Sequence, residues 1–137
     1  MARIISIDYG GKRTGIAVTD PMKIIATGLI TIPTGELIPF LKNYFIKEQV
    51  ERIIIGDPKN LDNTDTNATP LVKKAIALLK KTFPKIPVET VDERYSSKMA
   101  KAAMLEMGMK KKQRREKENV DLVAATLLLQ EYLRSIV

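Results

Sequence analysis

The sequence predicts an α/β fold in which a five-stranded mixed sheet carries helices on both faces. Three strand-like runs separated by short turns open the chain, and they predict an antiparallel meander. Strands and helices alternate after the meander, which predicts right-handed crossovers between parallel strands. The chain has 137 residues, 45% of them hydrophobic, and this predicts one domain over 1–137 with a core of its own.

The meander occupies the first quarter of the chain. Its predicted strands are rich in Ile, Val and Thr and cover 3–9, 14–19 and 24–32. Gly-Gly at 10–11 and Asp-Pro at 20–21 mark the two turns between them. Because both turns are short, successive strands must pair antiparallel.

The rest of the chain predicts four helices and two strands. Helices are expected at 35–48, 69–84, 97–107 and 119–136, and strands at 52–55 and 87–91. Thr69 and Asn119 are the expected N-caps, and Gly108 ends the third helix. The first helix is predicted to have Leu37, Leu41, Tyr44 and Phe45 on one side, and the second carries Leu71, Ile76, Leu79 and Phe83.

The amino-acid composition limits the kinds of catalytic site and partner that the chain can have. The chain contains neither Cys nor His, which excludes disulfides, thiolate zinc sites, and catalysis by Ser-His or Cys-His triads. A net charge of +7 favours an anionic partner, of which nucleic acid is the commonest, although basic composition also serves solubility. No signal-peptide pattern and no run of membrane-spanning length is visible, so we expect a cytoplasmic protein without a membrane partner.

Three acidic residues stand where elements begin or end. Asp8 closes the first strand, Glu93 follows the strand at 87–91, and Asp121 lies in the first turn of the expected last helix. Ala124 and Ala125 would let that helix approach the sheet closely. Each acid also has a simpler explanation, as a turn residue, a surface ion pair or a helix-dipole partner, and Asp92 could replace Glu93.

If the three acids meet, they form a site for a hard cation. Clustered carboxylates repel one another, and Mg²⁺ or Mn²⁺ with oxygen ligands relieves the repulsion. Two such ions about 4 Å apart stabilise both the attacking water and the leaving oxygen of a phosphodiester. The predicted catalytic and metal-binding residues are therefore Asp8, Glu93 and Asp121.

Basic residues surround these acids in the sequence. Flexible cations beside an acidic site can neutralise the phosphates that flank the cleaved bond, although a solvated linker would have the same composition. The predicted nucleic-acid-binding residues are Lys12, Arg13, Arg94, Lys110, Lys111, Lys112, Arg114 and Arg115.

Four motifs in order give the chain a family resemblance. They are DYGGKRTGIA at 8–17, G-x-P at 56–58, DERYSS at 92–97, and D-x-x-A-A at 121–125 followed by LLLQEYL. The chain resembles the YqgF or RuvX family of pre-16S rRNA nucleases, which have a ribonuclease H-like fold. The resemblance implies catalytic acids matching Asp8, Glu93 and Asp121, and a role in maturing the 5′ end of 16S rRNA, with Holliday junction resolution as the older proposal. Asp57 and Asn63 depart from the family pattern.

The preferred prediction is a metal-dependent endonuclease acting on precursor rRNA. The first alternative is the same chemistry on branched DNA, which a homodimer would favour and a monomer would not. The second is a nucleic-acid-binding module without catalysis. An ATPase of the actin or sugar-kinase type would need two such domains, and this chain has length for one.

Overall fold

The computed structural model describes residues 2–57, 69–92 and 117–136. Its strands are β1 (Arg3–Tyr9), β2 (Arg13–Thr19), β3 (Ala26–Pro33), β4 (Val50–Asp57) and β5 (Val88–Asp92). Its helices are a short 3₁₀ helix η1 (Thr34–Glu36), α1 (Leu37–Lys47), α2 (Thr69–Thr82) and α5 (Lys117–Ser135). The predicted helix at 97–107 lies outside the described residues.

The sheet has the predicted mixed topology, with the strand order β3-β2-β1-β4-β5. β1 pairs antiparallel with β2, and β2 pairs antiparallel with β3. On its other edge β1 pairs parallel with β4, and β4 pairs parallel with β5. The antiparallel meander and the parallel crossovers are therefore both confirmed.

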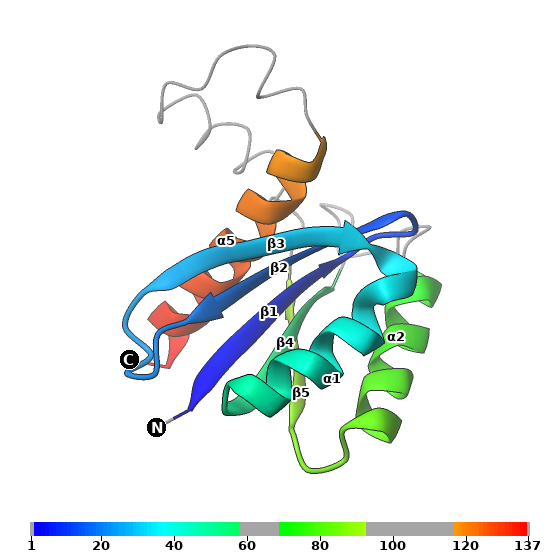
Figure 1. Ribbon diagram of the computed structural model, residues 1–137. Coiled ribbons are helices and arrows are strands. Elements are labelled where there is room, and N and C mark those ends of the chain that lie inside the picture. Colours follow the sequence, from blue (N-terminus) through cyan, green and yellow to red (C-terminus); the bar gives the residue numbers. More distant parts are fainter. Residues whose placement is uncertain (1, 58–68, 93–116, 137) are drawn as a thin grey trace.

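Helices cover both faces of the sheet, with α1 and α2 on one face and α5 on the other (Figure 1). Side chains alternate along β1, so Ile5 and Ile7 pack under α1 and α2 while Ile4 packs under α5. Because β1 and β4 are buried on both faces, neighbouring positions of each strand carry large apolar residues, Ile4 and Ile5 in β1 and the run 53–55 in β4.

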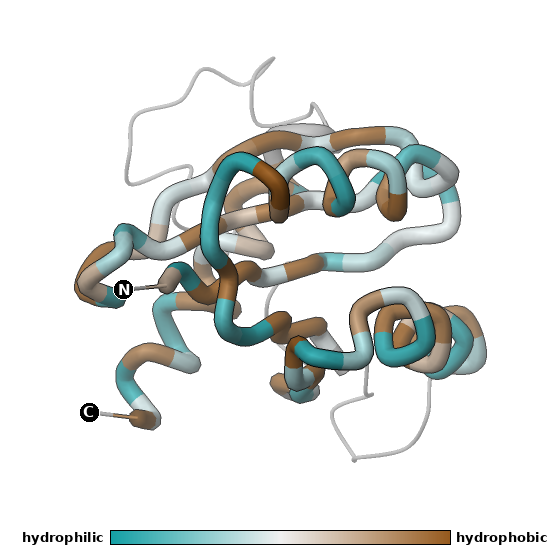
Figure 2. Tube along the Cα trace, turned by 60° about the horizontal axis from the view of Figure 1, so that its bottom comes forward, coloured by the Kyte–Doolittle hydropathy of each residue, from teal (hydrophilic) through white to brown (hydrophobic). Residues whose placement is uncertain are grey.

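The face under α1 and α2 is built from large apolar side chains. Leu41 and Leu79 are fully buried, and the rings of Phe45 and Phe83 meet edge to face at 4.8 Å. Hydrophobic and hydrophilic residues alternate around the coils of these helices, as expected for helices with one buried side (Figure 2). Of the apolar residues that α2 carries, Leu71 is 44% exposed, because the buried side of the helix runs through Val72 and Leu79.

Most element boundaries differ from the prediction by one or two residues, and two of them, the starts of β3 and α5, have a consequence or a visible cause. β3 begins at Ala26 rather than Ile24, because the Asp20 carboxylate accepts hydrogen bonds from the amides of Ile24 and Ile25 at 2.8 and 2.7 Å and lengthens the turn. Those bonds also lower the pKa of Asp20. α5 begins at Lys117, two residues before the expected cap at Asn119, so Asp121 lies in the second turn of the helix and not in the first. The residues ahead of Asn119 include Lys and Glu, which favour helix interiors.

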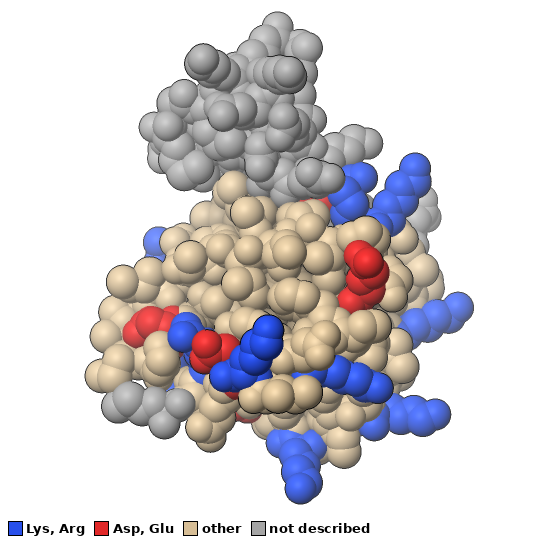
Figure 3. Space-filling model, in the orientation of Figure 1, with Lys and Arg blue, Asp and Glu red and all other residues tan. Residues whose placement is uncertain are grey.

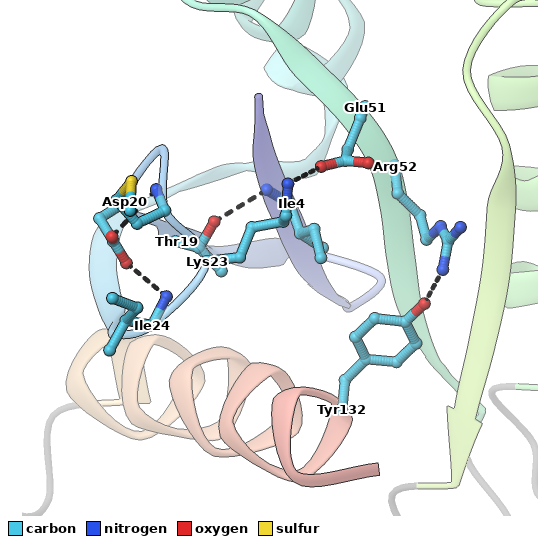
Figure 4. A network of polar contacts seen from close by, with 9 residues as sticks. Ile4, Thr19, Asp20, Lys23, Ile24, Glu51, Arg52 and Tyr132 are labelled. Carbon is cyan, nitrogen blue, oxygen red and sulfur yellow. Dashed lines mark hydrogen bonds and ion pairs between the residues drawn. The ribbon is translucent and has the colours of Figure 1, made fainter. Parts of the chain in front are cut away.

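A polar network fixes the C-terminal half of α5 at the end of the sheet where β4 and β5 begin. Tyr132 accepts a hydrogen bond from Arg52 (Figure 4). It donates to Glu89 Oε2 at 2.9 Å, and Arg52 also pairs with Glu89 at 3.3 Å. Burial raises the pKa of the Tyr132 hydroxyl. Lys23 and Glu51 form a separate ion pair at the same end. The opposite end of α5 carries Asp121.

Candidate active site

Asp8 lies on the face of the sheet that α5 covers. Ser6, two residues earlier in β1, is fully buried and donates from its Oγ to the backbone carbonyl of Ala125 at 2.9 Å. Because side chains alternate along a strand, Asp8 projects to the same face as Ser6. The expectation that Asp8 shares a face with Ser6 and Ile4 is consistent with the packing of Ile4 against α5.

Gly15 brings α5 down onto the sheet beside Asp8. In the register of the β1–β2 pair, Gly15 is the partner of Asp8, so the two residues face the same side. A Cβ atom on Gly15 would lie 2.3 Å from the carbonyl oxygen of Asp121. The backbone of the helix therefore rests directly on β2 at this point, and Asp121 lies beside the strand position opposite Asp8.

Asp8 and Asp121 lie at nearly equal distances along their elements from the hydrogen bond that joins Ser6 to Ala125. Asp121 is one helical turn from Ala125, a rise of about 6 Å, and Asp8 is two strand residues from Ser6, about 6.6 Å. Ala124 and Ala125 are both buried, with exposed fractions of 1% and 0%. This confirms that small residues let the helix lie close to the sheet. The structure thus brings together two predicted acids from opposite ends of the chain.

Arg13 pairs with one of these acids. Its Nε donates to Asp121 Oδ2 at 3.0 Å, and both side chains are partly exposed. Arg13 lies two residues before Gly15 in β2, which places its side chain on the same face. The sequence predicted a phosphate contact for Arg13. The structure adds that its guanidinium balances a charge at the acidic site.

A glycine turn and a threonine fix the hairpin tip that follows Asp8. A Cβ on Gly10 would lie 2.4 Å from the Arg13 carbonyl oxygen, so only glycine fits this turn. Thr34 donates from Oγ1 to the Gly10 carbonyl at 2.6 Å and from its amide to the Lys12 carbonyl at 2.9 Å. Lys12 is exposed at the tip. The turn therefore presents a cation next to the acids.

The third predicted acid lies just beyond the described residues. β5 ends at Asp92, one residue before Glu93, and β1, β4 and β5 are parallel strands that end at one edge of the sheet. The other predicted residues outside the described ranges are Arg94, Lys110, Lys111, Lys112, Arg114 and Arg115. Within 2–57, 69–92 and 117–136, no group of three or more acidic residues could hold a metal ion. Asp8 and Asp121 offer the hard oxygen donors that Mg²⁺ and Mn²⁺ prefer, and an incoming cation would also meet Arg13.

Two residues that organise the site were missed from the sequence. Ser6 joins β1 to α5, and Gly15 admits the helix backbone. A glycine inside a strand pattern often marks a close backbone approach, so Gly15 carried a usable signal. Nothing local distinguishes Ser6, because its partner, Ala125, lies at the other end of the chain.

Comparisons with known proteins agree with this geometry. A family model described as RuvX, Holliday junction resolvase, matches residues 2–135. A protein of Christiangramia forsetii is 50% identical over 97% of this chain and 98% of its own length, and one of Bacteroides thetaiotaomicron is 52% identical over 98% of both. Both carry the name "Putative pre-16S rRNA nuclease".

Solved structures share the fold at low sequence identity. A fowlpox virus resolvase in complex with Holliday junction DNA has a TM-score of 0.61 at 14% identity and covers 98% of this chain and 99% of its own. Thermus thermophilus RuvC with a Holliday junction has a TM-score of 0.56 at 16% identity and covers 98% and 96%. These likenesses confirm the ribonuclease H-like arrangement.

None of the helices within the described ranges is long and apolar enough to cross a membrane. The match over residues 2–135 and the relatives at about half identity together show that the chain belongs to the RuvX family.

Proposed function

We propose that this protein is a divalent-metal-dependent endonuclease that hydrolyses phosphodiester bonds in precursor 16S rRNA, in the cytoplasm. The observation that carries the proposal is the placement of Asp8 and Asp121 on one face at the end of β1, where Gly15 lets α5 touch the sheet. The names of relatives about 50% identical over nearly the whole chain support the RNA substrate.

In this proposal Asp8, Asp121 and Glu93 are the catalytic acids and the metal ligands. Bound Mg²⁺ or Mn²⁺ would polarise the phosphate and lower the pKa of the attacking water. Asp8 is held by the strand that Ser6 ties to α5, and Asp121 is held by its bond to Arg13. A cation bound here would share Asp121 with the Arg13 guanidinium, so we expect the two positive charges to compete.

The remaining cations would bind substrate rather than the metal. Lys12 stands at the hairpin tip next to Asp8, where it can meet a phosphate beside the cleaved bond. We assign the same role to Arg94 and to the basic run that holds Lys110, Lys111, Lys112, Arg114 and Arg115. These contacts recognise the nucleic-acid backbone, so they do not by themselves distinguish RNA from DNA.

The second candidate function is resolution of Holliday junctions. It is favoured by the description of the family model and by the junction DNA in the two solved structures above. Symmetric cleavage of a four-way junction needs two sites related by a two-fold axis. A homodimer in solution would therefore favour this candidate, and a monomer would favour precursor RNA.

The proposal is tested by incubating purified protein with precursor 16S RNA and with a four-way DNA junction, each with Mg²⁺, Mn²⁺ or a chelator. We expect metal-dependent cleavage of the RNA. Asp8→Asn should lower the cleavage rate about a thousandfold, because it removes a charged ligand, while nucleic-acid binding persists. The matched control is Asp20→Asn, which changes a carboxylate in the β2–β3 turn, away from the site, and should cleave normally.

Three other results of these assays would contradict the proposed function, each in a different way. Cleavage of the junction alone selects the second candidate. Binding without cleavage under every metal condition would mean a non-catalytic nucleic-acid-binding module. Cleavage by Asp8→Asn at the wild-type rate would show that the acids are assigned wrongly.

A further inference from the structure

α2 carries a row of cations that the candidate site does not use. Its sequence, TPLVKKAIALLKKT, contains four lysines and no acidic residue. All four lysine side chains, Lys73, Lys74, Lys80 and Lys81, are exposed, and a fifth exposed lysine, Lys85, follows the helix. A surface that served solubility alone would mix the two signs of charge.

Helical periodicity arranges these lysines in two rows. Lys73 and Lys80 are seven residues apart, so they lie on one side of α2 about 10.5 Å from each other. Lys74 and Lys81 form a second, parallel row that points away from the buried Leu79. The helix therefore presents two lines of positive charge along its length.

The lysines of α2 differ from most basic residues elsewhere in the described chain. Within the described ranges, no ion pair joins any of the five lysines to an acid, and their mutual repulsion is not balanced locally. Five other described cations pair with carboxylates, in the pairs Arg3–Glu48, Arg13–Asp121, Lys23–Glu51, Arg52–Glu89 and Arg134–Glu131, whereas the exposed and isolated Lys12, Lys42 and Lys47 are in none of these pairs. An external anion would supply the missing counter-charge.

The two rows start next to the candidate active site. A Cβ on Gly11, in the turn that follows Asp8, would lie 3.8 Å from Leu71 Cδ1 in the first turn of α2. Exposed Lys12 belongs to the same turn. From there α2 leads away along the side of the molecule, where Figure 3 shows Lys and Arg side chains projecting into solvent. Exposed lysines thus occur at the hairpin tip, along α2 and at Lys85 just after it.

We propose that this α2 surface binds the sugar–phosphate backbone of the substrate at a distance from the cleaved bond. The inference rests on the proposed nuclease function and adds the path that the nucleic acid takes. Regularly spaced cations without acids suit a repeating polyanion, and the start of the rows beside Asp8 suits a strand that leaves the site. Lysines contact phosphates as point charges, so the surface would bind without sequence preference.

The test measures the salt dependence of binding in a chelator, where no cleavage occurs. Full-length wild type and the double variants K73Q/K80Q and K74Q/K81Q bind a fluorescein-labelled single-stranded RNA, followed by anisotropy across a salt series. The slope of log K against log salt is negative, and each lost phosphate contact should reduce its magnitude by about 0.7, so each double variant should show a slope less steep by about 1.4. Gln and Lys have similar helix propensity, and thermal melts should show that both variants fold.

The matched control is K23Q/R134Q, which also removes two positive charges but from residues paired with Glu51 and Glu131. Its slope should equal that of wild type. If the α2 variants keep the wild-type slope while wild type cleaves RNA, this inference is overturned and the proposed function stands. If wild type binds no RNA, both are overturned. Loss of binding to phosphatidylserine vesicles with an unchanged RNA slope would overturn it in favour of a membrane surface.

Discussion

The two faces of the sheet are built by different means. Under α1 and α2, large side chains such as Ile7, Leu41 and Leu79 fill the space between helix and strand. Under α5, Gly15 and Ala125 bring helix and strand backbones together. Side chains of Leu and Ile can shift rotamer to absorb a change, but two backbones in contact cannot. The α5 face therefore fixes the position of Asp121, while the other face mainly supplies stability.

The largest effect is expected where the backbones touch. Gly15→Ala would place a methyl group 2.3 Å from the carbonyl oxygen of Asp121 and 2.6 Å from its carbonyl carbon. The helix must move away, so we expect a loss of more than about 3 kcal/mol in the free energy of unfolding and loss of cleavage in the folded fraction. Urea denaturation and the cleavage assay measure the two effects.

Gly35→Ala is the control for that substitution, because a Cβ there meets no atom within 4 Å. It should leave stability within about 1 kcal/mol of wild type. A Gly15→Ala protein as stable and active as the Gly35→Ala protein would show that the contact with Asp121 does not constrain the site.

A substitution on the other face should separate stability from activity. Leu41 is fully buried in α1, and Leu41→Ala should cost about 3 kcal/mol through lost burial and the cavity it leaves. Because α1 packs on the face of the sheet opposite α5, which carries Asp121, folded molecules should cleave at the wild-type rate. Urea denaturation and cleavage below the melting transition check this. A cleavage rate that falls as far as in Gly15→Ala would mean that the two faces are not independent.

Most of the fold followed from local pattern. Periodicity predicted the strands and helices that the structure describes, because each buried face repeats at the period of its element. The sequence was least informative where a tertiary or polar contact determines which side of a helix is buried or where a strand begins. The apolar character of Leu71 does not tell that it is partly exposed, because Val72, Ala75 and Leu79 together form the buried side of α2. β3 starts late because Asp20 holds the turn amides.

The sequence pointed to the acidic residues of the candidate site but not to the contacts between them and their neighbours. The positions of Asp8 and Asp121 at element ends pointed to them, and the structure places them on one face. The bond from Arg13 to Asp121 could not be predicted, since it depends on the register between β2 and a helix at the other end of the chain. The helical spacing of the lysines of α2 can be seen in the sequence. Only the structure shows that the ion pairs within the described residues do not include these lysines.

The smallest effect on stability is expected at this Arg13–Asp121 pair, which lies on the α5 face of the sheet and is partly exposed. Arg13→Gln removes a partly exposed ion pair, so unfolding in a chelator should change by less than about 1 kcal/mol. The same change removes a positive charge beside the acids. A unit charge about 6 Å from a divalent ion costs about 1.4 kcal/mol in water-like surroundings, which is about tenfold in Kd.

We therefore expect Arg13→Gln to bind Mn²⁺ up to about tenfold more tightly than wild type, measured by calorimetry and by the rise in melting temperature with added metal. Lys23→Gln is the control, because it removes an equal charge from the Glu51 pair at the far end of the sheet and should leave Mn²⁺ affinity unchanged. Weaker Mn²⁺ binding by Arg13→Gln would mean that the guanidinium orients Asp121 for the ion more than it repels the ion. In that case the pair would belong with Ser6 and Gly15 among the contacts that hold the acids in place.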